Sequence, residues 1–146
     1  MLHLLFRLGH ETFALPAMDI EAVLAVPELA TLDHAPAHLA GLMRYHGQFI
    51  PVLDISLLHG GASAPAVIST RIILVRPAPD APLLGLIVEQ AMEMLNLEVR
   101  QTLAPEWVGS SDWLAPEVFD TELGLVRAVN WRALLTPEIQ GLAEQA

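Results

Sequence analysis

Short apolar runs, repeatedly interrupted by proline and glycine, constrain the fold of this chain more than any other feature. Residues 2–8 alternate in hydrophobicity with a period of two and end at a glycine, a pattern typical of a strand that enters a turn. Residues 71–75 and 84–88 are nearly continuous apolar runs of strand length, which indicates strands buried on both faces. No run approaches the roughly 20 apolar residues of a membrane-spanning helix. We therefore expect an all-β fold with short helices.

The same reasoning predicts about eight to ten short strands in the whole chain. Further strands are expected at residues 12–15, 22–26, 48–55, 92–99 and 124–129, with residues 57 and 58 as a short extension. Residues 71–75 and 84–88 should form a hairpin through the proline-rich turn at 76–82. Because proline cannot donate to a strand ladder, Pro51 predicts an edge strand or a bulge.

Helices and loops follow from the remaining proline and glycine residues. A single short helix is expected over residues 35–41, because Pro36 suits a first helical turn and Gly41 suits a helix end. Helical turns are expected after Pro16 and at 131–135, with a closing helix from Pro137. Two loops are expected, a flexible connection between halves at 59–66 and a longer segment at 102–116 that carries Trp107 and Trp113.

Charge and cysteine content exclude several classes of function. The chain has 17 acidic and seven basic residues, a net charge of −10, and all seven basic residues are arginines. Binding to nucleic acid and insertion into a membrane are therefore not expected. The absence of cysteine removes disulfides, thiolate nucleophiles and cysteine-ligated zinc. Residues 1–7 lack the features of a secretory signal, so a cytoplasmic protein is expected, and an apolar fraction of 53% predicts exposed patches for partners.

An enzyme hypothesis rests on His46, Asp54 and Glu89, which in principle could carry out acid–base chemistry. No nucleophile has a recognisable setting, since Ser110 and Ser111 lack the flanking glycine pattern of a nucleophile elbow. No catalytic residue is therefore predicted.

Cofactor and metal sites are also not predicted. The Gly60 and Gly61 pair lacks the lysine and serine or threonine of a phosphate-binding loop. His34 and His38 have the four-residue spacing of a helical metal site, but Pro36 between them should start the helix and leave His34 outside it.

One segment has the composition of a binding anchor. Arg44, Tyr45 and His46 stand together where the predicted helix turns into the next strand, and exposed arginine and aromatic side chains frequently anchor partner proteins. The tryptophans at 107, 113 and 131 are more typical of core packing or loop anchoring than of a ligand cage.

The run at residues 41–55, GLMRYHGQFIPVLDI, resembles the signature of the CheW family, commonly Gly-x-x-Asn-x-Arg-Gly-x-x-x-Pro-Val-x-Asp-Leu. Similarity extends to the residues around Phe6, Leu8 and Gly9, to Ala14-Leu15-Pro16, to Ala35-Pro36, to Gly85 through Glu89 with Glu93, and to Val129-Asn130-Trp131 with Leu134 and Leu135. The resemblance therefore covers nearly the whole chain.

The resemblance implies two packed SH3-like five-stranded β-barrels in a single domain of residues 1–146. The first barrel would take about 14–66, the second about 1–13 plus 67–136, and the C-terminal helix 137–146. The implied function is that of an adaptor without enzymatic activity or cofactor. It would couple the cytoplasmic tip of methyl-accepting chemoreceptors to a CheA-type histidine kinase, through the kinase's CheW-like regulatory domain, in membrane-associated receptor arrays.

The resemblance also assigns roles to individual residues of this sequence. Receptor binding falls on Ile20, Gly41 and Gly85, kinase binding on Arg44, Tyr45, His46 and Gly47, and structural roles on Pro51 and Asp54. For Asp54 we expect backbone or arginine hydrogen bonds rather than catalysis.

Two departures from the signature fall in the kinase-contact segment. Arg44 replaces the usual Asn, and His46 replaces the usual Arg, which exchanges a permanently charged bidentate donor for a smaller ring. We interpret the chain as a diverged paralogue with its own receptor and kinase, controlling an output other than swimming. Alternatives are a CheW-like module for another sensor kinase, a scaffold without kinase contact, and a small β-barrel ligand-binding domain or enzyme that uses the Trp107 and Trp113 loop.

Overall fold

The computed structural model describes residues 1–98, 101–102 and 113–145. Its strands are β1 (Leu2–Leu8), β2 (Glu11–Pro16), β3 (Ile20–Ala25), β4 (Leu39–Tyr45), β5 (Gln48–Asp54), β6 (Arg71–Val75), β7 (Leu84–Val88), β8 (Gln90–Asn96), β9 (Gln101–Thr102), β10 (Leu114–Thr121) and β11 (Gly124–Val129). Its helices are η1 (Ala17–Asp19), α1 (Ile55–Gly60), η2 (Trp131–Leu134) and α3 (Pro137–Gln145). The prediction of an all-β fold with short helices is confirmed.

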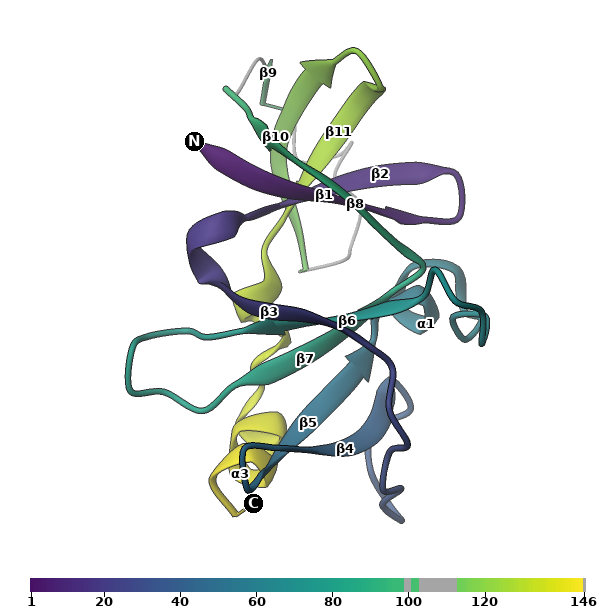
Figure 1. Ribbon diagram of the computed structural model, residues 1–146, viewed down its shortest axis with the longest axis vertical. Helices are drawn as coiled ribbons and strands as arrows, with labels where there is room; N and C mark the ends of the chain where they lie inside the picture. The colour runs from purple at the N-terminus through teal and green to yellow at the C-terminus, as the bar shows by residue number, and fades with distance from the viewer. Residues whose placement is uncertain (99–100, 103–112, 146) are drawn as a thin grey trace.

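The strands form two sheets, one above the other in Figure 1. The six-stranded sheet, called sheet A, has the order β8-β1-β2-β11-β10-β9, and the five-stranded sheet, called sheet B, has the order β3-β6-β7-β5-β4. Most neighbours are antiparallel, but β2 runs parallel to β11 and β5 runs parallel to β7. The chain passes from sheet A to sheet B through η1 and returns directly from β7 to β8.

Alternation along the strands divides the buried side chains into three groups. The largest group lies between the sheets and draws on Leu4, Phe6 and Leu8 of β1 as well as Leu84 and Leu86 of β7. Smaller groups cover the opposite faces, so strands such as β7 are buried on both sides. Helix α3 lies beside β5, and its Ile139 is fully buried in the group between the sheets (Figure 1).

The helix expected at residues 35–41 is wrong. A turn precedes β4, which begins at Leu39 and pairs with β5, while Leu42 exchanges hydrogen bonds of 2.8 and 2.9 Å with Ala30. Pairing on both sides of this segment stabilises a strand in spite of the local proline and glycine pattern. Residues 44 and 45 consequently end a strand instead of following a helix.

The chain after β5 also differs from expectation. Residues 57 and 58 belong to α1 and not to a strand, because Asp54 caps that helix by accepting a hydrogen bond from Ser56 N. Helix α1 also takes in the first two residues of the loop expected at 59–66, ends at Gly60 and is capped by Gly61, whose φ is 75°.

The boundary between the two β-units also differs from the predicted boundary. β6 and β7 pair with β3 and β5 in sheet B, whereas the expected second unit began at residue 67. Sheet A takes all of β2 and resumes at β8, so the units divide after Val88. β10 covers residues expected to be loop, and Pro116 is accommodated where the register with β11 shifts between Leu114 and Val118.

Candidate functional site

The turn between β4 and β5 is a tight hairpin turn with left-handed backbone. His46 has a φ of 50° and Gly47 a φ of 81°, between Tyr45 and Gln48, which face each other across the strands. Positive φ at both central residues matches the twist of the flanking strands, and glycine adopts it without strain. The turn therefore brings the last residues of β4 and the first residues of β5 together at one end of the hairpin.

Side chains beside this turn are arranged against one another, with Arg44, His46 and Phe49 exposed and Tyr45 half-buried. The Tyr45 and His46 rings stack with centroids 4.1 Å apart and planes 11° apart. The Arg44 guanidinium carbon lies 5.1 Å from the centre of the Phe49 ring, and Phe49 is 38% exposed. Cation–π and stacking contacts of this kind fix side chains before a partner arrives. We call Arg44, Tyr45, His46, Gly47 and Phe49 the hairpin surface.

Phe49 is a member of this surface that the sequence interpretation missed. It faces Arg44 across the two strands, a pairing set by the register of the hairpin. A two-residue turn at His46 and Gly47 indicates that register, but a helix predicted up to residue 41 and a turn after it hide the pairing.

The two glycines assigned to receptor binding lie in one row across sheet B. Gly41 pairs with Val52 on β5, and Val52 pairs with Gly85 on β7. A Cβ atom on Gly85 would lie 3.0 Å from Val52 Cγ2 and 3.2 Å from Ile72 Cγ2, so this glycine permits close packing inside the sheet. Since Gly85 is buried, it can influence a partner through the shape of the sheet and not through contact.

Ile20, the third residue of that set, lies apart from the glycine row at the start of β3. It is half-buried against the apolar group between the sheets and pairs with Val75 on β6. Its place at the passage between sheets leaves part of the side chain accessible.

Pro51 lies in β5, which is flanked by β4 and β7, so the predicted edge strand is wrong. The alternative prediction, a bulge at Pro51, is also wrong, because the register shift of the β4–β5 pair lies between Leu39 and Gly41. Leu42 of β4 lies opposite Pro51, but its backbone N–H and C=O point away from β5 and bond to Ala30. Leu42 and Pro51 therefore form a non-hydrogen-bonded pair, in which the Pro51 nitrogen points away from β4. The ladder to β7 covers residues 52–54 and starts after Pro51. Proline therefore removes no ladder bond here.

Asp54 is buried and uses both carboxylate oxygens. Its Oδ1 accepts a hydrogen bond from Ser56 N at 3.0 Å, and its Oδ2 accepts one from Ala64 N, also at 3.0 Å. These bonds fix the start of α1 and the loop that follows it. The geometry is that of a helix cap.

Replacing Asp54 with alanine is expected to lower the free energy of unfolding by about 2 kcal/mol, because a cap is lost and the Ala64 N–H loses its acceptor. Chemical denaturation of the purified variant measures the change. The exposed Asp33 provides a matched control, and Asp33→Ala should change stability by less than about 0.5 kcal/mol. Equal stabilities for the two variants would contradict the capping role.

A second carboxylate connects the two sheets. Glu89 accepts hydrogen bonds from Gly9 N in the β1–β2 turn at 3.1 Å and from Ser56 Oγ in α1 at 2.8 Å. Asp54 and Glu89 are thus both engaged by structural donors, while His46 lies at the far end of the seven-residue β5, roughly 20 Å from Asp54. The three residues of the enzyme hypothesis are not brought together.

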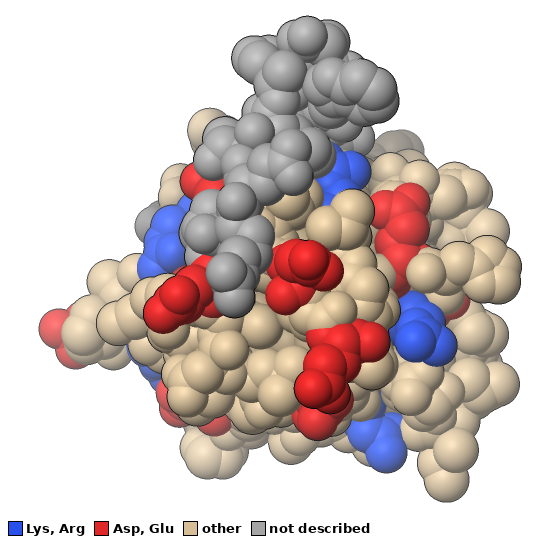
Figure 2. All heavy atoms as spheres, turned by 90° about the horizontal axis from the view of Figure 1, so that it is seen from above, with Lys and Arg blue, Asp and Glu red and all other residues tan. Residues whose placement is uncertain are grey.

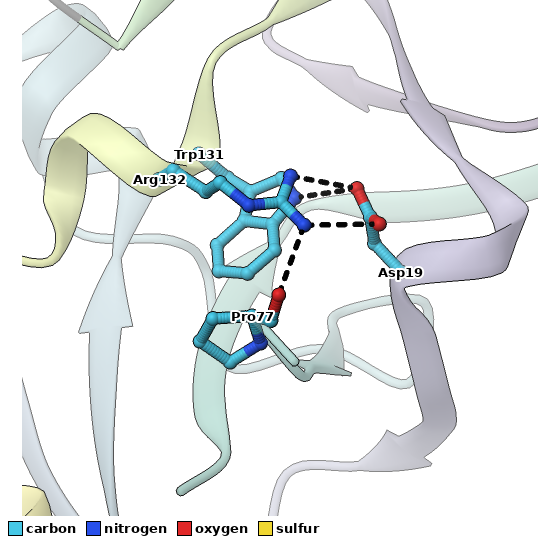
Figure 3. A network of polar contacts seen from close by, with 4 residues as sticks. All are labelled: Asp19, Pro77, Trp131 and Arg132. Atoms are coloured by element: carbon cyan, nitrogen blue, oxygen red, sulfur yellow. Dashed lines mark hydrogen bonds and ion pairs between the residues drawn. The ribbon is translucent and has the colours of Figure 1, made fainter. Parts of the chain in front are cut away.

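Asp19 in η1 forms a polar junction that the sequence interpretation missed (Figure 3). Its Oδ2 accepts hydrogen bonds from Trp131 Nε1 at 3.0 Å and Arg132 Nη1 at 3.2 Å, and its Oδ1 accepts one from Arg132 Nη2 at 3.3 Å. Arg132 Nη2 also donates to the Pro77 carbonyl at 3.3 Å. We call Asp19, Pro77, Trp131 and Arg132 the Asp19 junction. Asp19 is separated from Trp131 by 112 positions, so no local pattern could indicate it.

The other candidate sites have no support as chemical centres. Trp113 is 4% exposed and lies within the apolar group between the sheets, while Trp107 falls outside the described residues. His34 and His38 share no helix. Across residues 1–98, 101–102 and 113–145, no group of three or more histidine, aspartate or glutamate side chains could hold a metal ion.

A cavity of about 410 Å³ opens on the surface of sheet B. It is lined partly by Val67 and Ile68, which are 53% and 88% exposed. On the face seen in Figure 2, acidic and uncharged surface separates the arginines from one another. Among the helices that the structure describes, none combines the length and hydrophobicity needed to cross a bilayer.

Comparison with known proteins agrees with the resemblance noted in the sequence. The Probable chemotaxis protein CheW of Rhizobium etli is 22% identical over 92 residues, which is 63% of this chain and 58% of that protein. The chemotaxis protein CheW of Rhizobium meliloti is 23% identical over 95 residues, which is 65% of this chain and 60% of that protein. The chain thus matches about three fifths of the length of these relatives.

A solved structure shows the same fold. The scaffolding protein TtCheW from Thermoanaerobacter tengcongensis aligns with a TM-score of 0.74 at 21% identity, covering 88% of this chain and 82% of that one. The family model of the CheW-like domain matches residues 2–120. Because that match takes in most of the sequence and the two-sheet fold agrees with it, the chain belongs to the CheW-like domain family.

Proposed function

We propose that this protein is a non-enzymatic adaptor that couples the cytoplasmic tips of methyl-accepting chemoreceptors to a CheA-type histidine kinase. Family membership supports the proposal, as does the naming of its relatives as chemotaxis and scaffolding proteins. In this role the protein works on the cytoplasmic side of receptor arrays.

The hairpin surface is the observation that carries the kinase half of this proposal. Arg44 and Phe49 offer a fixed cation and an exposed ring, and Tyr45 with His46 adds a second flat surface beside them. Arginine and aromatic side chains held in place before binding are typical anchors of protein interfaces. The positions coincide with the segment for which the family resemblance implies kinase contact.

The receptor half rests on the passage between the sheets. Ile20 is partly accessible there, and the row of Gly41, Val52 and Gly85 allows the strands of sheet B to pack closely. A partly accessible apolar side chain suits the apolar face of a receptor helix.

Replacing Arg44 with alanine is expected to weaken binding to the CheW-like regulatory domain of the cognate kinase by about tenfold, because the cation over Phe49 is removed. Titration of the purified kinase domain against each variant, followed by calorimetry, measures the effect. Arg7, also exposed but on β1 of sheet A, is the matched control, and Arg7→Ala should bind as the wild type does.

A wild-type protein that binds neither the kinase domain nor a receptor-tip fragment, and leaves kinase activity in receptor arrays unchanged, would contradict the adaptor function. Equal losses of affinity for Arg44→Ala and Arg7→Ala would instead reject the hairpin surface as the kinase contact.

A further inference from the structure

Three segments that are distant in sequence meet at the Asp19 junction. Asp19 lies in η1, where the chain leaves sheet A for sheet B, Pro77 lies in the β6–β7 connection, and Trp131 and Arg132 lie in η2. Figure 3 shows the Arg132 guanidinium between the Asp19 carboxylate and the Pro77 carbonyl. The junction thus links η1, which leads from sheet A into sheet B, with η2, which leads from sheet A to α3.

The junction is buried on the side of Asp19 and Trp131, whereas the Arg132 side chain is 50% exposed. The Asp19 side chain is 12% exposed, and Trp131 is 2% exposed with its ring 4.6 Å from the Arg132 guanidinium carbon. Hydrogen bonds between charged groups are stronger than neutral ones, and two of them approach the two carboxylate oxygens from one guanidinium. The carbonyl of Asp19 also accepts a hydrogen bond from Arg76 N at 3.0 Å.

The next residue in the chain is Ile20, and these contacts hold the backbone on its N-terminal side. Ile20 N donates to the Ala17 carbonyl, and the register with β6 shifts between Ile20 and Ala22. Irregular register of this kind turns a side chain away from the direction that a regular strand would give it. The orientation of Ile20 therefore depends on where η1 is held, and Asp19 holds η1.

We propose that Asp19, through Arg132 and Trp131, is a positioning residue that orients Ile20 for docking of the chemoreceptor tip. The inference rests on the proposed adaptor function and adds to it the residues that set receptor affinity without contacting the receptor. The hairpin surface is formed by β4, β5 and their turn, and it shares no residue with the junction, which is formed by η1, η2 and the β6–β7 connection. Receptor binding should depend on the junction, and kinase binding should not.

The experiment compares full-length variants in binding to two purified probes from the same genome. One probe is a soluble fragment of a methyl-accepting chemoreceptor tip, and the other is the CheW-like regulatory domain of a CheA-type kinase. Asp19→Asn keeps the shape of the side chain and removes its charge. Asp80→Asn, at an exposed site in the β6–β7 connection, is the matched control.

Asp19→Asn should weaken receptor binding by about tenfold while kinase binding stays within about twofold of wild type. Arg132→Lys should act in the same direction, because lysine cannot reach both carboxylate oxygens and the Pro77 carbonyl with a planar fork. Asp80→Asn should change neither affinity. This variant set keeps the test valid even if one substitution reduces folding.

Two results would overturn the inference while leaving the adaptor function intact. The first is wild-type receptor affinity in both junction variants. The second is an equal loss of receptor and kinase binding that follows the thermal unfolding midpoint, since this would assign the junction a purely structural role. A wild-type chain that fails to bind the receptor fragment would instead reject the proposed function, and the inference with it.

Discussion

Replacing Trp131 with alanine is expected to lower the free energy of unfolding by about 3–5 kcal/mol, the largest effect of any single substitution considered for this protein. The indole is 2% exposed within the apolar group between the sheets, so its removal leaves a cavity that the neighbouring side chains cannot fill. The same substitution removes the donor to Asp19. Denaturant unfolding of the purified variant, monitored by circular dichroism, measures the change.

Trp131→Phe separates the two contributions. Phenylalanine keeps most of the ring volume but has no N–H for Asp19, so a loss of about 1–2 kcal/mol is expected. If alanine and phenylalanine destabilise the protein equally, the hydrogen bond outweighs packing at this position. A change below about 1 kcal/mol for alanine would contradict the burial of this side chain.

Gly41→Ala is expected to destabilise the protein by about 3 kcal/mol even though it adds a single methyl group. A Cβ atom at this position would lie 2.5 Å from the Ala30 carbonyl oxygen and 3.0 Å from Leu29 Cβ, and the φ of Gly41 is 152°. The Ala30 backbone is held by its two hydrogen bonds to Leu42 and cannot withdraw without breaking them. Thermal and denaturant unfolding of the variant measure the expected loss.

Gly141→Ala is the matched control for this substitution. Nothing lies within 4 Å of a Cβ atom at Gly141, which is inside α3, where alanine is favoured over glycine by about 0.5–1 kcal/mol. The control should therefore leave stability unchanged or raise it slightly. A Gly41 variant as stable as the Gly141 variant would show that the Ala30 segment moves aside easily.

Local sequence signals were sufficient for the elements whose shape depends on their own residues. The alternation of residues 2–8 predicted β1, the apolar runs predicted β6 and β7, and the pattern from Thr136 to Glu138 predicted the start of α3. In each case the residues that form the element also carry its hydrophobic pattern.

Elements that depend on distant pairing could not be predicted in this way. Residues 35–41 look like a short helix by themselves, but residues 35–38 form a turn, and the strand conformation from Leu39 onward comes from pairing with β5 and Ala30. Pro116 indicates a loop, and it is the irregular register with β11 that admits it into β10. Likewise, nothing in the sequence of β6 and β7 says which sheet they join, because that choice is made by pairing with β3 and β5.

In the candidate site, too, some features follow from local sequence and others depend on distant pairing. Arg44, Tyr45 and His46 could be selected from the sequence because their residue types are typical of interface anchors. Phe49 beneath Arg44 depends on hairpin register, and the contact of Asp19 with Trp131 depends on the relative placement of the two sheets. Side-chain partners chosen by tertiary packing leave no periodic signal.

The parallel pairing of β2 with β11 has a consequence for the order of folding during synthesis. Every strand of sheet B lies between residues 20 and 88, so that sheet can assemble while the rest of the chain is still being made. Sheet A needs β11, at residues 124–129, to fill the place between β2 and β10. Until then the edge of β2 that pairs with β11 has no neighbour, so its backbone hydrogen-bonding groups remain open to other strands.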